Sequence, residues 1–156
     1  MISLQNINPK ILVIGDLMID HYLWGSCNRI SPEAPVPVIN IVNESKLLGG
    51  AGNVVNNLNS LGAQVDIISV VGICKVSLEL KTLLSDIKAD TRYLIIQNDR
   101  VASKKTRVIA GQQQVIRYDL ESSDEINNKS QIAILNVFKK IVNNYDVILL
   151  SYYGKG

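Results

Sequence analysis

Short, uninterrupted apolar runs that alternate with amphipathic stripes restrict the fold of this chain more than any other feature. Residues 10–14 form such a run and end at Gly15 and Asp16, the pattern of a parallel strand buried on both faces. Similar runs at 64–71, 91–96 and 146–150 alternate with helical stripes at 53–61, 76–87 and 134–142. Strands that alternate with helices predict a parallel sheet covered by helices. We therefore expect a doubly wound, Rossmann-like α/β fold with helices on both faces.

Two segments break this alternation. Residues 34–42 have no helical period, and their apolar side chains fall on both faces of an extended segment. Their prolines favour a strand at a sheet edge. Residues 105–119 form a second β-like pair on either side of Gly111, where a hairpin loop is expected. We predict a small β lid made of segments at about 20–42 and 104–119. Such a lid could close over a site or pair with another copy of the chain.

The composition limits the classes of partner. The chain has 156 residues, of which 47% are hydrophobic and 19% charged, so it should bury the core of a single domain. Its formal net charge of +2 argues against a nucleic-acid surface or a membrane-attracted patch. The apolar runs are far shorter than the ~20 residues that span a bilayer, and the N-terminus lacks a leader pattern. We expect a soluble, cytoplasmic protein.

Two sites can be argued against from residue types alone. Cys27, Cys74 and His21 are too few and too widely spaced for a structural zinc site, so we expect two reduced, packed thiols and no metal. Ser31 lies near His21, but the sequence has no G-x-S-x-G elbow, which argues against a nucleophile triad.

The glycine cluster before the first predicted helix is a candidate ligand contact. Gly49, Gly50 and Gly52 match neither the P-loop nor the dinucleotide fingerprint, so a structural turn and a close approach to a ligand both remain open. Asn53 favours the ligand, because its amide offers a donor and an acceptor to a polyol.

Asp16 and Asp20 form the second candidate. A carboxylate at the end of a buried parallel strand lies where open α/β sheets bind ligands, and it can accept hydrogen bonds from two sugar hydroxyls. A turn or helix-cap role is the alternative.

The predicted hairpin at 105–119 is basic, and Lys104 directly precedes it. This basic hairpin is the third candidate. With a three-residue loop Arg107 falls opposite Arg117, and Lys105 opposite Asp119, whereas a two-residue loop places the two arginines on opposite faces. Facing arginines repel each other, and a bound phosphate would relieve the repulsion. A solvated basic face is the alternative.

Four motifs together carry a resemblance to a known family. They are Val-Ile-Gly15-Asp16-x-x-x-Asp20, the segment 29–38 (Arg-Ile-Ser-Pro-Glu-Ala-Pro-Val-Pro-Val), 49–53 (Gly-Gly-Ala-Gly-Asn) and 107–119. From about residue 11 to its last residue, the chain strongly resembles the ribokinase-like sugar kinases. It is most similar to the bacterial heptose 7-phosphate kinases, which are often the N-terminal domain of a bifunctional ADP-heptose synthase.

The resemblance implies a Rossmann-like core and a β lid that closes over the sugar and often pairs two subunits, so a homodimer is expected. It implies that D-glycero-β-D-manno-heptose 7-phosphate is phosphorylated at its anomeric hydroxyl from ATP with magnesium, a step toward the ADP-heptose of lipopolysaccharide core. The residues that would hold the sugar hydroxyls are Asp16, Asp20, Gly49, Gly50 and Asn53. The candidates for its phosphate are Arg29, Lys105, Arg107 and Arg117.

The chain departs from the family pattern in two ways. The Gly-x-Gly-Asp segment with the catalytic aspartate, and the nucleotide-binding loops, are not in it, so ATP and magnesium are expected to bind mainly elsewhere. Tyr152 stands where related kinases usually have an aspartate; Tyr152, Tyr153 and Trp24 are interpreted as packing residues. We interpret residues 1–156 as the N-terminal portion of a ribokinase-like kinase domain, from a truncated chain, a gene fragment or a split reading frame, with no catalytic residue and no activity alone.

Two alternatives stay open. The chain could belong to another ribokinase-like kinase that acts on fructose, ribose or a nucleoside. It could also be a non-catalytic sugar-binding or dimerising fragment that associates through the extended segment at 35–42.

Overall fold

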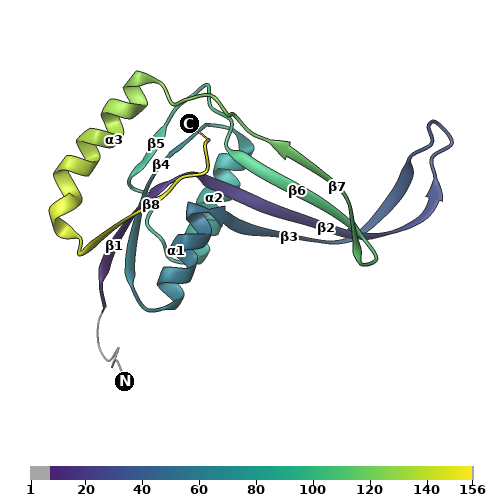
Figure 1. The fold of residues 1–156 in the computed structure, drawn as a ribbon, viewed down its shortest axis with the longest axis horizontal. Coiled ribbons are helices and arrows are strands. Elements are labelled where there is room, and N and C mark those ends of the chain that lie inside the picture. The colour runs from purple at the N-terminus through teal and green to yellow at the C-terminus, as the bar shows by residue number, and fades with distance from the viewer. Residues whose placement is uncertain (1–7, 156) are drawn as a thin grey trace.

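The computed structural model describes residues 8–155 and contains two four-stranded sheets (Figure 1). The core sheet is parallel throughout. Its strands, in spatial order, are β5 (Leu94–Ile96), β4 (Gln64–Val71), β1 (Lys10–Gly15) and β8 (Val147–Ser151). The predicted parallel α/β core is confirmed. β5 is shorter than expected because Asp90 accepts the backbone N–H of Arg92 at 2.8 Å, which holds the preceding residues in a turn.

Helices cover both faces of the core sheet (Figure 1). They are α1 (Ala51–Ser60), α2 (Lys75–Asp86) and α3 (Asn128–Ile141), the last followed by the short 3₁₀ helix η1 (Val142–Asn144). Within residues 8–155, none of the helices is both long enough and apolar enough to cross a membrane.

Alternating side chains of β1 divide the core into two layers. Ile11 and Val13 pack in the cluster that includes Val55 of α1 and Leu80 of α2. Leu12 packs on the opposite face, in the cluster that Ile134, Val137 and Phe138 of α3 complete. Both faces of β1 are therefore buried, which explains its uninterrupted apolar sequence.

The second sheet forms the lid and projects from the core as a long arm (Figure 1). Its order is β3 (Pro37–Gly50), β2 (Leu17–Ile30), β6 (Ser103–Ala110) and β7 (Gln113–Leu120). The expected edge position of the proline-containing strand is confirmed. The lid is longer than predicted at 20–42, because β2 begins only one residue after β1 and β3 runs directly into α1.

The hairpin between β6 and β7 reaches the three-residue register with a two-residue turn. Ala110 pairs with Gln113, so the turn holds only Gly111 and Gln112, and a bulge between Val108 and Ile109 then shifts the ladder by one residue. Beyond the bulge Arg107 faces Arg117. The sequence-based link between loop length and register was wrong because it left out the bulge.

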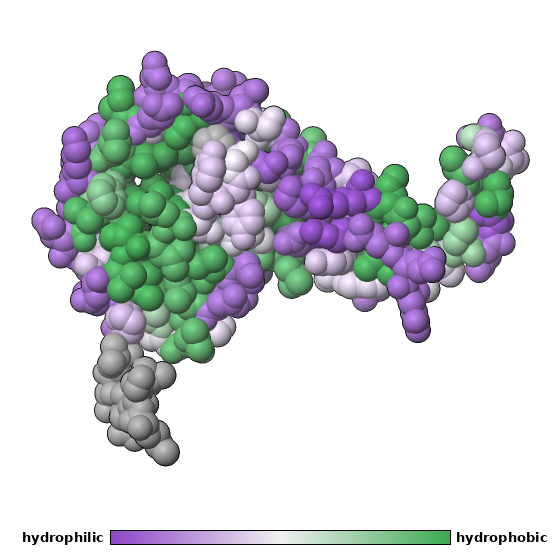
Figure 2. All heavy atoms as spheres, in the orientation of Figure 1, coloured by the Kyte–Doolittle hydropathy of each residue, from purple (hydrophilic) through white to green (hydrophobic). Residues whose placement is uncertain are grey.

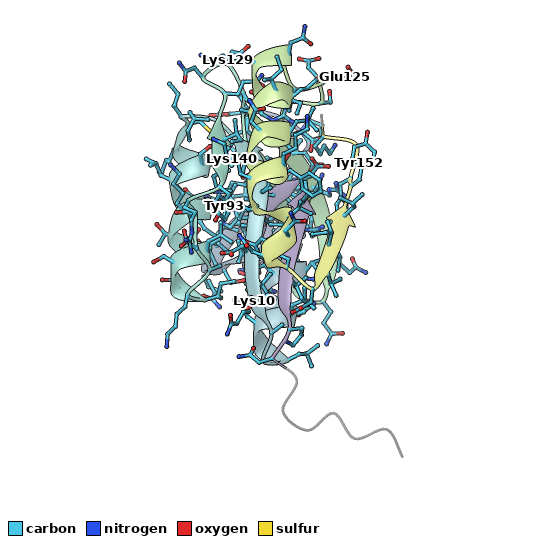
Figure 3. All side chains as sticks on the ribbon, turned by 90° about the vertical axis from the view of Figure 1, so that its left-hand side faces the viewer. Lys10, Tyr93, Glu125, Lys129, Lys140 and Tyr152 are labelled. Atoms are coloured by element: carbon cyan, nitrogen blue, oxygen red, sulfur yellow. The ribbon has the colours of Figure 1, made fainter. Side chains whose placement is uncertain are left out.

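Exposure corrects two packing predictions. Cys27 and Cys74 are both free thiols, but only Cys74 is partly buried, whereas Cys27 is exposed on the lid. Tyr152 is 78% exposed and Tyr153 54% exposed, so more than half of each side chain is uncovered in this chain. Figure 3 shows Tyr152 beside the end of β8, pointing away from α3.

We expect that Lys88→Gly stabilises the chain. Lys88 follows α2 with φ +58°, the left-handed conformation that glycine adopts without a Cβ penalty. Relief of this strain should raise the free energy of unfolding by about 0.5–1 kcal/mol, measured by urea denaturation. Lys129→Gly, at a position with ordinary helical geometry in the first turn of α3, is the control and should be destabilising. An unchanged or lowered stability of Lys88→Gly would contradict the strain.

Candidate functional site

Asp16 is the single residue between core strand β1 and lid strand β2. Its carbonyl oxygen accepts the backbone N–H of Ala51, the first residue of α1, at 3.0 Å. Its Oδ2 atom accepts the backbone N–H groups of Tyr153 at 2.7 Å and Lys155 at 3.3 Å. The predicted position at a strand end is confirmed, and Asp16 joins the core, the lid and the segment after β8.

Gly49 and Gly50 pack directly on the two aspartates. A Cβ atom on Gly49 would overlap Oδ2 of Asp20, and one on Gly50 would lie 2.5 Å from the carbonyl oxygen of Asp16. Gly50 also has φ +55°. The glycines therefore allow the β3–α1 junction to lie against both carboxylate-bearing residues.

Asp20 on β2 holds an arginine of the neighbouring strand. Nη1 of Arg107 donates to its Oδ1 at 2.6 Å, and the same guanidinium lies 5.2 Å from the ring centroid of Tyr22. Tyr22 in turn stacks on Trp24 with their centroids 5.5 Å apart. Residues 20, 22 and 24 share one face of β2 because side chains alternate along a strand.

A cavity of about 360 Å³ lies between the root of the lid and helices α1 and α2. Asp20 and Tyr22 line it from β2, and Asn53 and Asn56 line it from α1. The structure thus brings Asp20 and Asn53, which are 33 positions apart, to one concave surface rich in hydrogen-bonding groups. Asp16 lies outside this cavity and lines another one at the strand ends.

The candidate cations of the β6–β7 ladder already have carboxylate partners. Lys105 Nζ lies 3.2 Å from both Asp119 and Glu121, and Arg117 donates two hydrogen bonds to Asp119 at 2.9 and 2.6 Å. The hydrogen bonds from Arg117 lower the pKa of Asp119 to about 2. The expected repulsion between the facing arginines is thus offset by Asp20 and Asp119 without a bound phosphate.

Arg29 stands apart from the other candidate cations. It is exposed near the far end of β2, where it pairs with Val38 of β3. Nine positions along a strand separate it from Asp20, or roughly 30 Å. Its proposed contact with the same phosphate is therefore not made within one chain.

Several potentially functional residues escaped the sequence analysis. Lys155 Nζ lies 2.6 Å from Glu121 Oε1, so the segment after β8 is tied to the lid. Tyr22 was not considered, and Trp24, taken as a packing residue, stacks on it. The alternation that places Tyr22 beside Asp20 could have indicated it, whereas no local signal pairs Lys155 with Glu121.

The described residues do not assemble a metal site. No group of three or more histidine, cysteine, aspartate or glutamate side chains within residues 8–155 could hold a metal ion. The two carboxylates expected to hold the sugar, Asp16 and Asp20, are engaged by backbone N–H groups and by Arg107. This part of the chain therefore does not fit magnesium by itself.

Solved structures with this arrangement define the class of fold. A carbohydrate kinase from Agrobacterium tumefaciens superposes with a TM-score of 0.68 at 22% identity, over 91% of this chain and 45% of that one. Arabidopsis thaliana ribokinase, solved in complex with ribose and ATP, gives 0.62 at 16% identity, over 92% and 45%. The fold is ribokinase-like.

Sequence comparisons then give the family. The model of the pfkB family carbohydrate kinases matches residues 8–152, so the chain belongs to this family. The bifunctional protein HldE of Aliarcobacter butzleri is 61% identical over 95% of this chain and 31% of its own length. The protein of the same name from Helicobacter hepaticus is 47% identical over the whole chain and 32% of its own length. The chain spans about a third of the length of these relatives.

Proposed function

We propose that this chain supplies the sugar-binding half of a kinase for D-glycero-β-D-manno-heptose 7-phosphate, which gives the 1,7-bisphosphate on the way to ADP-heptose. The observation that carries the proposal is the convergence of Asp20 and Asn53 on one cavity beside the paired Arg107. Identities of 44–61% to proteins named HldE support this sugar over fructose, ribose or a nucleoside.

The polar groups of the cavity suit a polyhydroxylated ligand. A carboxylate accepts hydrogen bonds from hydroxyls, and an asparagine amide both donates and accepts. Arg107 is held by Asp20 and Tyr22, and in this proposal it exchanges part of its carboxylate contact for a phosphate oxygen. ATP with magnesium supplies the phosphoryl group, and we assign its binding mainly to the part of the relatives beyond this match. We expect no turnover from the chain alone.

We propose that the lid also pairs two copies of the chain in the cytoplasm. Lid residues Ile41, Val42, Ile116 and Tyr118 are exposed, and β3 presents a free edge that a second chain could cover. Figure 2 shows apolar atoms along the arm. The second subunit's lid would bring its own Arg29 into reach of a site that the first chain's Arg29 does not reach.

The test of the sugar site is Asn53→Ala. Loss of an amide that hydrogen-bonds sugar hydroxyls should weaken binding by about 1–3 kcal/mol, measured by calorimetric titration of the chain with heptose 7-phosphate. Asn57→Ala, an exposed neighbour on the same helix outside the cavity, is the control and should bind normally. Unchanged affinity in Asn53→Ala, or tighter binding of ribose, fructose or a nucleoside than of the heptose, would refute the assignment.

A further inference from the structure

Arg100 is the only buried arginine or lysine in the part of the chain that the structure describes. It lies between β5 and β6 and is 7% exposed. Within residues 8–155, its guanidinium donates one hydrogen bond, from Nη1 to the carbonyl oxygen of Asp124 at 3.1 Å. No carboxylate oxygen of residues 8–155 lies within 4 Å of it. A buried charge normally has an ionic partner, because desolvation without one is strongly unfavourable.

The remaining guanidinium nitrogens of Arg100 are not completely enclosed. No fully buried side-chain nitrogen or oxygen lacks a partner among the described residues. Nε and Nη2 donate no hydrogen bond to these residues, so both atoms must retain some accessible surface. Together these two atoms form the edge of the guanidinium that binds a carboxylate or phosphate through two parallel hydrogen bonds. The bond from Nη1 to Asp124 fixes the plane of the group.

Arg100 lines a cavity of about 330 Å³ at the carboxyl ends of β1, β4 and β8. Ile14, Ile68 and Leu150 supply apolar wall, and Asp16, Ser69 and Tyr152 supply its other polar groups. Ligands of open α/β sheets bind at this edge. An apolar wall strengthens the attraction between a guanidinium and an anion, since it lowers the local dielectric constant.

The other cations near the proposed sugar site differ from Arg100. Lys105, Arg107 and Arg117 each contact a carboxylate. Among residues 8–155, Arg100 instead donates a hydrogen bond to a neutral carbonyl and forms no ion pair. Asp16, the one acid in the cavity wall, has its Oδ2 engaged by two backbone N–H groups. We infer that Arg100 is an anion-binding residue that takes a phosphate group in the cavity at the strand ends.

This inference deepens the proposed function, on which the choice of phosphate rests. Two phosphates could occupy the cavity, that of the sugar acceptor or that of the nucleotide, and both offer the same tetrahedral oxyanion. The recognition itself depends only on Arg100 and the cavity, so it can be tested with inorganic phosphate and without any sugar.

The experiment compares phosphate binding by the chain and by Arg100→Gln. Sodium phosphate should raise the thermal unfolding midpoint of the unaltered chain above its value in sodium chloride of equal ionic strength, because a ligand of the folded state stabilises it. In Arg100→Gln this increment should disappear, with phosphate bound about tenfold more weakly or worse. Each increment is taken from the variant's own baseline, so a change in basal stability does not affect the comparison.

Arg92→Gln is the matched control. Arg92 is exposed at the other end of the sheet and paired with Asp90 at 2.7 Å, and its loss should leave the phosphate increment intact. No increment in the unaltered chain, or a full increment in Arg100→Gln, would overturn the inference. If Arg100→Gln does not fold, the ¹⁵Nε–H resonance of Arg100 in the unaltered chain decides: it should shift as phosphate is added, and a resonance that stays in place overturns the inference.

Titrations with three ligands then identify the source of the phosphate. If Arg100 holds the acceptor, Arg100→Gln loses its preference for heptose 7-phosphate over the free heptose; if it holds the nucleotide, the variant loses ATP affinity instead. Either loss supports the anion site, and unchanged binding of all three ligands overturns it. Failure here, with Asn53→Ala still defective in sugar binding, would leave the proposed function standing.

Discussion

Replacement of Gly50 by alanine is expected to destabilise the chain more than any other single substitution considered for this site. The added Cβ would lie 2.5 Å from the carbonyl oxygen of Asp16 and 2.8 Å from Cε of Met18, in a backbone conformation with φ +55° and ψ −132° that only glycine adopts readily. The conformational strain costs about 1–3 kcal/mol, and the steric overlap adds about as much. Urea denaturation should therefore show a loss of about 2–6 kcal/mol in the free energy of unfolding.

Gly62→Ala separates the two contributions. Gly62 has φ +90°, but a Cβ there would meet no atom within 4 Å, so this variant carries only the conformational strain. The difference between the two losses measures the close approach of β3 to Asp16. Equal losses would mean that the junction relaxes, and that Gly50 is required only for its backbone conformation.

The second large effect is expected on specificity. In Arg107→Ala, the chain should lose most of its preference for heptose 7-phosphate over the free heptose, because a charged hydrogen bond to phosphate contributes about 1.5–3 kcal/mol, or roughly 10–150-fold in affinity. Calorimetric titration with the two sugars gives the ratio directly. The variant also leaves Asp20 without its partner, which is why the ratio of affinities and not the absolute affinity is the measurement.

Arg117→Ala is the matched control for this effect. Arg117 faces Arg107 across the ladder but is more exposed and is held by Asp119 on its own strand, so its loss should change the ratio less. If Arg107→Ala lowers the affinity for both sugars by the same factor, Arg107 does not bind the phosphate.

Local pattern was sufficient to predict the core of the fold. β1 carries apolar side chains on both of its faces, so both faces must be covered. Helices α1, α2 and α3 provide this cover. The lid was less predictable, because its strands pair at long range. The contact of Asp20 with Arg107 joins residues 87 positions apart and depends on the parallel pairing of β2 with β6, which no local turn fixes.

The sequence predicted which residue types form the candidate site better than it predicted the contacts between them. Asp16, Asp20 and Asn53 carry chemistry that a sequence shows, and their placement near the junctions follows from strand and helix boundaries. The partners of the basic ladder were predicted in part: one of the two registers considered placed Lys105 opposite Asp119, as observed. The contacts of Lys105 with Glu121 and of Arg117 with Asp119 were missed, because Glu121 lies beyond the predicted hairpin and the arginine contact is made within one strand. Arg100 was missed for a different reason: a single arginine between two strands shows nothing of its burial.

The length of the lid has a mechanical consequence. β2 and β3 each extend for 14 residues. The chain connects them to the core at Asp16 and at the Gly50–Ala51 step, which a hydrogen bond holds together, and their roots pack into the core through Leu17, Ile19 and Leu48. A strand of that length measures roughly 46 Å, so a rotation of about 5° at this root would sweep its tip through about 4 Å. The lid is therefore a lever arm whose root contains Asp16, and a small repacking at the glycine junction would displace its tip much further than its root.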